Sequence, residues 1–94
     1  MLEKIKKALR ISNAAFDEEV TDLISAAQHD LELSGVIHEK AVSEDDSLIV
    51  RAVTVYCKAN FGFDNPDAEK LQESYVMIKT HLTLSAEYTE GVGA

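Results

Sequence analysis

Residues 48–59 place the strongest constraint on the fold, because this segment is apolar on almost every side. Drawn as an α-helix, it has only three polar side chains, Arg51, Thr54 and Lys58, and these form one narrow stripe. A helix that is apolar around most of its circumference must be surrounded by other elements. The pattern therefore predicts a central helix over about residues 44–61, with the rest of the chain packed around it.

The other segments favour helices as well. Apolar residues recur at helical spacing over about residues 2–10, 14–34 and 66–84. Four glycines and one proline among 94 residues suit long helices better than a turn-rich β-fold. We therefore expect an all-α fold, a small bundle of about four helices, in a single domain that spans residues 1–85.

Residues that commonly cap helices predict where these helices begin. Asn13 precedes the second helix, and Asn65 precedes the fourth, with Pro66 at its first helical position. The sequence "SEDD" reads as a capping box, in which Ser43 caps the central helix and Asp46 reaches back.

Two segments lack a clear helical pattern. Residues 36–42 follow Gly35, which closes the second helix, and they read as a connection that could include a short extended piece. Residues 86–94 carry two glycines and no apolar periodicity, which predicts a mobile tail.

The corner after the central helix holds most of the residues to which we assign a structural role. Gly62 allows the helix to end, and the phenylalanine rings at 61 and 63 are expected to fasten the turn to the core. Asn60 falls among apolar positions, so its side chain is expected to bond backbone groups of residues 62–65. The full structural set is Cys57, Asn60, Phe61, Gly62, Phe63, Asn65 and Pro66.

Residue spacing indicates no catalytic, cofactor-binding or metal site. The three histidines, His29, His38 and His81, are not at helical i, i+3 or i, i+4 spacing, whereas metal ligands usually show local spacing. The only cysteine, Cys57, is interpreted as a buried apolar side chain, because a nucleophile would need a neighbouring base and some exposure. One cysteine, no apolar run of membrane-spanning length and no visible signal peptide predict folding in a reducing cytoplasm.

Charge is divided unevenly along the chain. The formal net charge is −8, which disfavours nucleic-acid binding because phosphates must be neutralised by lysine and arginine. Residues 1–10 nevertheless hold four basic residues and one carboxylate, a local +3, so the other 84 residues carry −11. A basic end and an acidic body could attract each other between neighbouring copies. The alternative is that the basic side of the first helix is simply solvated.

Two stretches resemble the head–tail connector proteins of tailed phages and prophages, also called DNA-packaging or head-completion adaptors. They are "LRISNAAFDEEVTDLISAA" and "RAVTVYCKANFGFDNPDAEKLQESYVMIKTHL". The likeness covers about residues 1–85 and rests on structural rather than catalytic motifs. The residues that carry it are Phe16, Asp17, Val20, Leu23, Ile24, Tyr56, Lys58, Ala59, Phe61, Gly62, Asp64, Asn65, Pro66 and Asp67.

The resemblance implies an α-helical adaptor without enzymatic activity or cofactor. Its copies would form a homo-oligomeric ring, expected to be a dodecamer, beneath the portal protein. The ring would extend the DNA channel and dock the next connector or tail protein, and packaged DNA would pass through it without sequence-specific binding. The chain is then expected at the head–tail junction of the virion, and before assembly in the bacterial cytoplasm as a monomer, with no membrane contact.

Ring interfaces are head-to-tail, so two different surfaces of each copy must match. The candidates are the basic first helix, the outward side of the fourth helix, where two apolar residues lie seven positions apart, and one aromatic residue in the tail. A lone exposed apolar side chain is also normal on a surface without a partner. The candidate interface residues are Lys4, Lys6, Lys7, Met77, Leu84 and Tyr88.

Other classes remain open. A small acidic helical protein could be a binding or inhibitor protein that mimics DNA or binds a host factor. A helix-turn-helix regulator is less compatible, because neither of the last two long helices has the basic surface that a phosphate backbone needs. An enzyme is the class that the sequence supports least.

Overall fold

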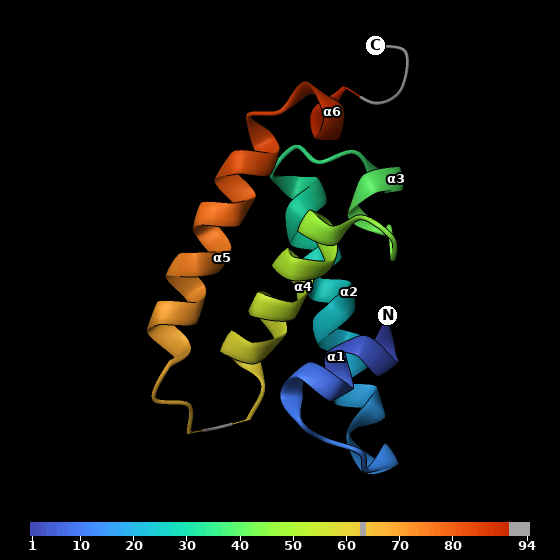
Figure 1. Ribbon diagram of the computed structural model, residues 1–94, viewed down its shortest axis with the longest axis vertical. Coiled ribbons are helices and arrows are strands. Elements are labelled where there is room, and N and C mark those ends of the chain that lie inside the picture. Colours follow the sequence, from blue (N-terminus) through green and yellow to red (C-terminus); the bar gives the residue numbers. More distant parts are fainter. Residues whose placement is uncertain (63, 91–94) are drawn as a thin grey trace.

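Helices account for all the regular secondary structure in the part of the chain that the computed structural model describes, residues 1–62 and 64–90 (Figure 1). The predicted all-α fold is confirmed. The elements are α1 (Leu2–Leu9), a 3₁₀-helix η1 (Ala14–Phe16), α2 (Asp17–Leu33), α3 (His38–Ala41), α4 (Ser47–Asn60), α5 (Ala68–Thr83) and α6 (Ala86–Thr89).

Helix α4 lies at the centre of the bundle, as its apolar circumference predicts. It packs against α1, α2 and α5, and Figure 1 shows it between α2 and α5. Of its polar stripe, Arg51 is exposed, and Thr54 and Lys58 are half-buried. Its buried residues are Ile49, Ala52, Val53, Val55 and Cys57.

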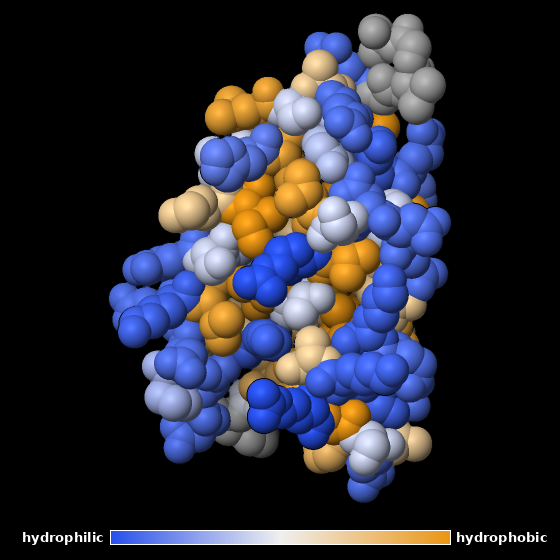
Figure 2. Space-filling view, in the orientation of Figure 1, coloured by the Kyte–Doolittle hydropathy of each residue, from blue (hydrophilic) through white to orange (hydrophobic). Residues whose placement is uncertain are grey.

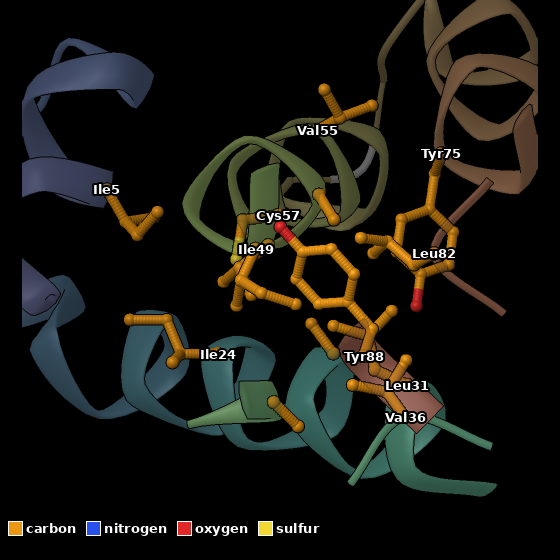
Figure 3. Packing of buried hydrophobic residues seen from close by; sticks show 14 of the residues in the cluster. Ile5, Ile24, Leu31, Val36, Ile49, Val55, Cys57, Tyr75, Leu82 and Tyr88 are labelled. Atoms are coloured by element: carbon orange, nitrogen blue, oxygen red, sulfur yellow. The ribbon is translucent and has the colours of Figure 1, made fainter. Parts of the chain in front are cut away.

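Helices α2 and α5 run in the same direction, antiparallel to α4 (Figure 1). Each turns an apolar stripe toward the core, and burial of each large side chain contributes about 1.5–3 kcal/mol. Figure 3 shows this core, to which α1 adds Ile5. The buried residues on the two flanking helices are Val20, Ile24, Ala27 and Leu31 on α2, and Tyr75 and Leu82 on α5.

Asp30 sets the position of α5 along α2. Its Oδ2 accepts a hydrogen bond from the Tyr75 hydroxyl at 2.6 Å and another from Lys79 Nζ at 3.0 Å. The Tyr75 ring also packs edge-on against Tyr56 on α4, with 5.1 Å between ring centroids. Because one carboxylate reaches two residues a turn apart on α5, Asp30 lies level with about residue 77.

The start of α4 differs from the prediction. Asp46, not Ser43, is the cap, and its Oδ1 accepts from the backbone amides of Leu48 at 3.0 Å and Ile49 at 3.2 Å. The Ser43 hydroxyl accepts from the amides of Asp45 at 3.3 Å and Asp46 at 3.1 Å, so it stabilises the turn before the helix. All these residue types favour caps, so the sequence alone does not select among them.

The predicted start of α5 is also wrong. Asp67 rather than Asn65 precedes the first helical residue, Ala68, and Pro66 lies in the preceding turn. The Asn65 side chain instead joins two segments: its Nδ2 donates to the Lys58 carbonyl at 2.6 Å, and its Oδ1 accepts from the Asp67 amide at 3.0 Å. The end of α4 leaves carbonyls without helical partners, and Asn65 satisfies one of them.

Asn60 does not have the role that the sequence predicted. It is exposed, and its Nδ2 donates to the carbonyl of Tyr56, one turn earlier in α4, at 2.9 Å. Helix α4 ends at Asn60, so the side chain lies beyond the buried part of the helix. The bond that we expected between this corner and the end of α4 is made by Asn65 instead.

Gly62 has φ +83°, the left-handed conformation that favours glycine, as the turn after α4 requires. The Phe61 ring packs edge-on against Phe16, with 5.7 Å between centroids, and this contact fastens the end of α4 to η1. Phe63, the second ring predicted to hold this corner, lies outside the described residues.

Two segments that we predicted to be non-helical contain short helices. In the connection over residues 36–42, His38–Ala41 form α3 rather than an extended piece. Residues 86–89, which we assigned to the tail, form α6, and the 7% exposed Tyr88 side chain enters the core (Figure 3). Four residues show too little periodicity for a pattern to reveal a helix. The remaining tail residues, 91–94, lie outside the described residues.

Candidate interaction surfaces

Helix α1 presents a basic face to solvent. Lys4, Lys7 and Arg10 are exposed on it. The Lys6 side chain, by contrast, is only 8% exposed, and its Nζ lies 2.7 Å from Asp17 Oδ1 at the start of α2. Lys6 therefore joins α1 to α2 inside the fold, and it does not belong to the exposed basic face that the sequence pattern predicts.

The beginning of α1 is held against the turn before α4. The amino-terminal group of Met1 bonds the Glu44 carboxylate, and this hydrogen bond, with the charge of the amino group, lowers the pKa of Glu44. Lys4 Nζ lies 3.4 Å from the Glu44 carbonyl oxygen, at the edge of hydrogen-bond range. These contacts orient α1 and leave its basic face directed outward.

Tyr88 is buried, although the sequence analysis predicts it to be an interface residue. Its hydroxyl donates to the Asp46 carboxylate, with 2.9 Å to Oδ2 and 3.1 Å to Oδ1. Burial, and then this hydrogen bond, raises the pKa of Tyr88 to about 12. Because the same carboxylate caps α4, Tyr88 joins α6 to the start of the central helix. No short-range sequence signal marks this pairing, since the two residues are 42 positions apart.

The outward side of α5 carries the two apolar residues that the sequence pattern placed there. Met77 is 65% exposed and Leu84 is 80% exposed, with Val76 beside them at 44%. Helix α2 has a matching feature that the sequence analysis does not predict, because Leu33 is 75% exposed. Its position off the buried stripe of α2 is the signal that could have identified it.

An apolar groove lies where α4, α5 and α6 meet. Its volume is about 430 Å³, and the half-exposed Leu48 lies at its edge. Figure 2 shows apolar side chains gathered between α4 and α5 on the face that it draws. The lining residues are Leu48, Ile78, His81, Leu82, Ser85, Glu87 and Tyr88.

An acidic recess lies on the first half of α2. It is shallow, with a volume of about 600 Å³, and it is lined by Ala15, Glu18, Glu19, Asp22, Leu23 and Ala26. The three carboxylates in it are exposed. Negative charge near the start of a helix is stabilised by the helix dipole. Because three exposed carboxylates lie together in it, the recess suits a basic group from another molecule.

The remaining reactive side chains do not form a shared centre in the described residues. Cys57 is fully buried, and burial raises the pKa of its thiol to about 12, so the thiol is protonated at neutral pH. His29, His38 and His81 lie on α2, α3 and α5. Over residues 1–62 and 64–90, no three His, Cys, Asp or Glu side chains are placed to hold a metal ion. None of the helices described is long and apolar enough to span a bilayer.

The fold defines the class of protein, which is a small helical bundle. Its exposed basic, acidic and apolar residues lie on the outward faces of α1, α2 and α5. The chain belongs to the phage connector protein family, whose sequence pattern matches residues 1–89. The match confirms the resemblance and includes all the helices from α1 to α6. The family is a structural one, and the chain accordingly has a connector-type structural role in a phage. No curated protein and no solved structure matches the chain.

Proposed function

We propose that this chain is the subunit of a ring that joins a phage head to its tail. The ring lies beneath the portal protein, extends the DNA channel, and docks the next connector or tail protein at the head–tail junction of the virion. The family match over residues 1–89 carries this proposal, because it includes the whole bundle rather than a fragment of it.

The charge distribution supports passage of DNA through such a ring. Residues 11–94 carry −11 of formal charge. Carboxylates that line a channel repel phosphates, so the duplex is not held at any sequence. DNA therefore slides through the ring without sequence-specific contacts.

The exposed residues support head-to-tail assembly. A closed ring requires two different surfaces on each copy, and the chain exposes unlike ones: the basic face of α1, the acidic recess on α2, and the apolar side of α5. Of the candidate interface residues, four remain available on these surfaces, namely Lys4, Lys7, Met77 and Leu84. We propose a dodecamer on the portal and a monomer before assembly.

The test measures the purified chain with and without the portal protein of the same phage. Light scattering after size-exclusion chromatography gives the mass of each species, and negative-stain electron microscopy shows whether a ring forms. We expect a monomer alone and a ring bound to the portal when both are present. A chain that stays monomeric and does not bind the portal at any concentration contradicts the proposal.

A second candidate function is supported by the acidic recess. Glu18, Glu19 and Asp22 present three carboxylates along α2, as an acidic binding or inhibitor protein would present them to a basic partner. This candidate predicts that the chain remains monomeric and indifferent to the portal, so the same experiment separates the two.

A further inference from the structure

Two helices of the bundle each present an exposed stripe to solvent. We call them the α2 outer face and the α5 outer face. Their members recur every three or four positions, so each set lies along one side of its helix, and all of them are exposed. The α2 outer face consists of Asp22, Ala26, His29 and Leu33, and the α5 outer face of Lys70, Glu73, Met77, Thr80 and Leu84.

The heights of these residues along the bundle follow from Asp30. This residue bonds both Tyr75 and Lys79, and α2 and α5 run in the same direction (Figure 1). Leu33 lies three residues beyond Asp30, about 4.5 Å along the axis at 1.5 Å per residue. Leu33 is therefore level with about residue 80, between Met77 and Leu84.

The heights of the charged residues follow from the same rise per residue. Asp22 lies eight residues before Asp30, and Lys70 lies seven residues before Met77, which places both about 10–12 Å below the level of Asp30. Between these levels, Glu73 is level with the small side chain of Ala26. Leu33 is thus level with apolar residues, Asp22 with a basic residue and Glu73 with a small one, while His29 is level with Met77. No like charges on the two faces coincide.

This alignment suits a second copy of the chain better than another partner. In a closed ring all copies have the same orientation relative to the ring axis, so only surfaces at equal height can meet. The α2 and α5 outer faces satisfy this condition when the long axis of the bundle is parallel to the ring axis. A two-fold dimer through the α2 outer face alone, with its axis parallel to α2, would bring the acidic recesses of both copies together.

We propose that the α2 outer face of one copy docks on the α5 outer face of the next copy. Leu33 inserts between Met77 and Leu84 of the neighbour, and Asp22 faces its Lys70. The pairing rests on the ring proposed above and specifies which surfaces close it. Neither Asp22 nor Lys70 forms an ion pair with any residue in 1–62 or 64–90, so both charges are available to the neighbour.

Cysteine cross-linking on the portal-bound assembly tests the apolar contact. The variant Leu33→Cys/Thr80→Cys is incubated with portal protein, oxidised mildly and separated by denaturing electrophoresis. We expect a ladder of dimers, trimers and longer chains, because each copy links to two neighbours. The variant Ser25→Cys/Thr80→Cys is the matched control: Ser25 is exposed on α2 but lies about 12 Å from Leu33 along the axis, so no ladder is expected.

A charge exchange tests the second contact. Asp22→Lys and Lys70→Asp each place like charges at the interface, and each is expected to weaken assembly about tenfold, which corresponds to about 1.4 kcal/mol. The double variant Asp22→Lys/Lys70→Asp restores the opposite charges and is expected to restore assembly. Both side chains are exposed, so melting temperatures should remain unchanged and report intact folds.

Electron microscopy of the unsubstituted chain distinguishes a failure of the pairing of faces from a failure of the ring function on which the pairing rests. If wild-type rings form but the Leu33/Thr80 pair gives no ladder, or the Ser25 control gives an equal one, the pairing of faces is wrong and the ring function stands. Failure of the double charge exchange to restore assembly also overturns the pairing. If no ring forms with the portal, the proposed function fails and the pairing fails with it.

Discussion

The Tyr75 hydroxyl donates a hydrogen bond to the Asp30 carboxylate across 2.6 Å, and it joins two helices whose residues are 45 positions apart in the chain. Lys79 reaches the same oxygen at 3.0 Å. Partial burial alone would raise the pKa of Asp30, but the hydrogen bonds from Tyr75 and Lys79, with the charge of Lys79, outweigh burial and lower the pKa. The ionised form of Asp30 therefore stabilises the fold.

This relationship predicts how stability depends on pH. Because the pKa of Asp30 is lower in the folded state than in the unfolded chain, its contribution is present above about pH 4 and is lost as the pH falls through the folded-state value. The variant Asp30→Asn should lower the free energy of unfolding at pH 7 by about 1 kcal/mol, a value reduced for solvent screening. Urea unfolding at pH 7 and pH 3 should show a smaller difference between the variant and wild type at pH 3. An equal deficit at both values would contradict this prediction.

Asn65 and Asn60 form a matched pair of amides at one corner. Asn65→Ala removes two hydrogen bonds, to the Lys58 carbonyl and from the Asp67 amide, and should cost about 1–2 kcal/mol of stability. Asn60→Ala removes one exposed bond within a helix and should change stability by less than about 0.5 kcal/mol. Thermal unfolding of both variants compares their losses of stability. A larger loss for Asn60→Ala would contradict the conclusion that Asn65 stabilises this corner.

Tyr88 should stabilise the whole bundle, although it lies near the end of the described chain. Tyr88→Ala removes a buried ring and is expected to cost about 3 kcal/mol. Tyr88→Phe keeps the ring and removes only the hydrogen bond to Asp46, so the expected cost is about 1 kcal/mol. Chemical denaturation measures both. Wild-type stability of Tyr88→Ala would indicate that α6 detaches without effect on the core.

The lysines of α1 should separate into two groups. Lys4→Glu/Lys7→Glu reverses two exposed charges, and we expect weaker ring formation on the portal, since the basic face is lost, with little change in melting temperature. Lys6→Met removes the partner of Asp17 and should lower the melting temperature by several degrees, about 1 kcal/mol of stability. Unchanged ring formation by Lys4→Glu/Lys7→Glu would exclude the basic face from assembly.

Cys57 should be inert in the folded protein. Its thiol is fully buried, and its pKa is raised to about 12 by burial, so the reactive thiolate is scarce at pH 8. A maleimide reagent should modify it slowly in buffer and rapidly in denaturant. Rapid modification in buffer would mean that Cys57 is accessible and has a role other than packing.

Much of the fold could be predicted from local patterns. The apolar circumference of residues 48–59 correctly predicted a central helix, and Asn13 caps η1 as expected, with its Oδ1 2.8 Å from the Ala15 amide. Both signals depend on residues a few positions apart. For the same reason the outward placement of Met77 and Leu84 could be predicted, since a helical wheel needs only the spacing within one helix.

The errors share a different cause. Ser43, Asn60 and Asn65 are all polar residues near helix ends, and each has several backbone groups within reach. Which group each one bonds depends on how the chain turns at that point. Lys6 and Tyr88 were assigned to the surface because their partners, Asp17 and Asp46, lie on other elements. No spacing rule within a short segment could reveal those pairs.

The sequence by itself determined that the chain is helical and that residues 48–59 form its centre, because apolar periodicity and helix-ending glycines act locally. Its resemblance to the connector family lies in two stretches of the sequence itself. Only the tertiary structure decided which of the lysines is buried, that α6 docks on the start of α4, and that Leu33 lies level with the gap between Met77 and Leu84. Those features depend on the relative positions of helices, and these positions are set by contacts such as Asp30 with Tyr75, between residues far apart in the chain.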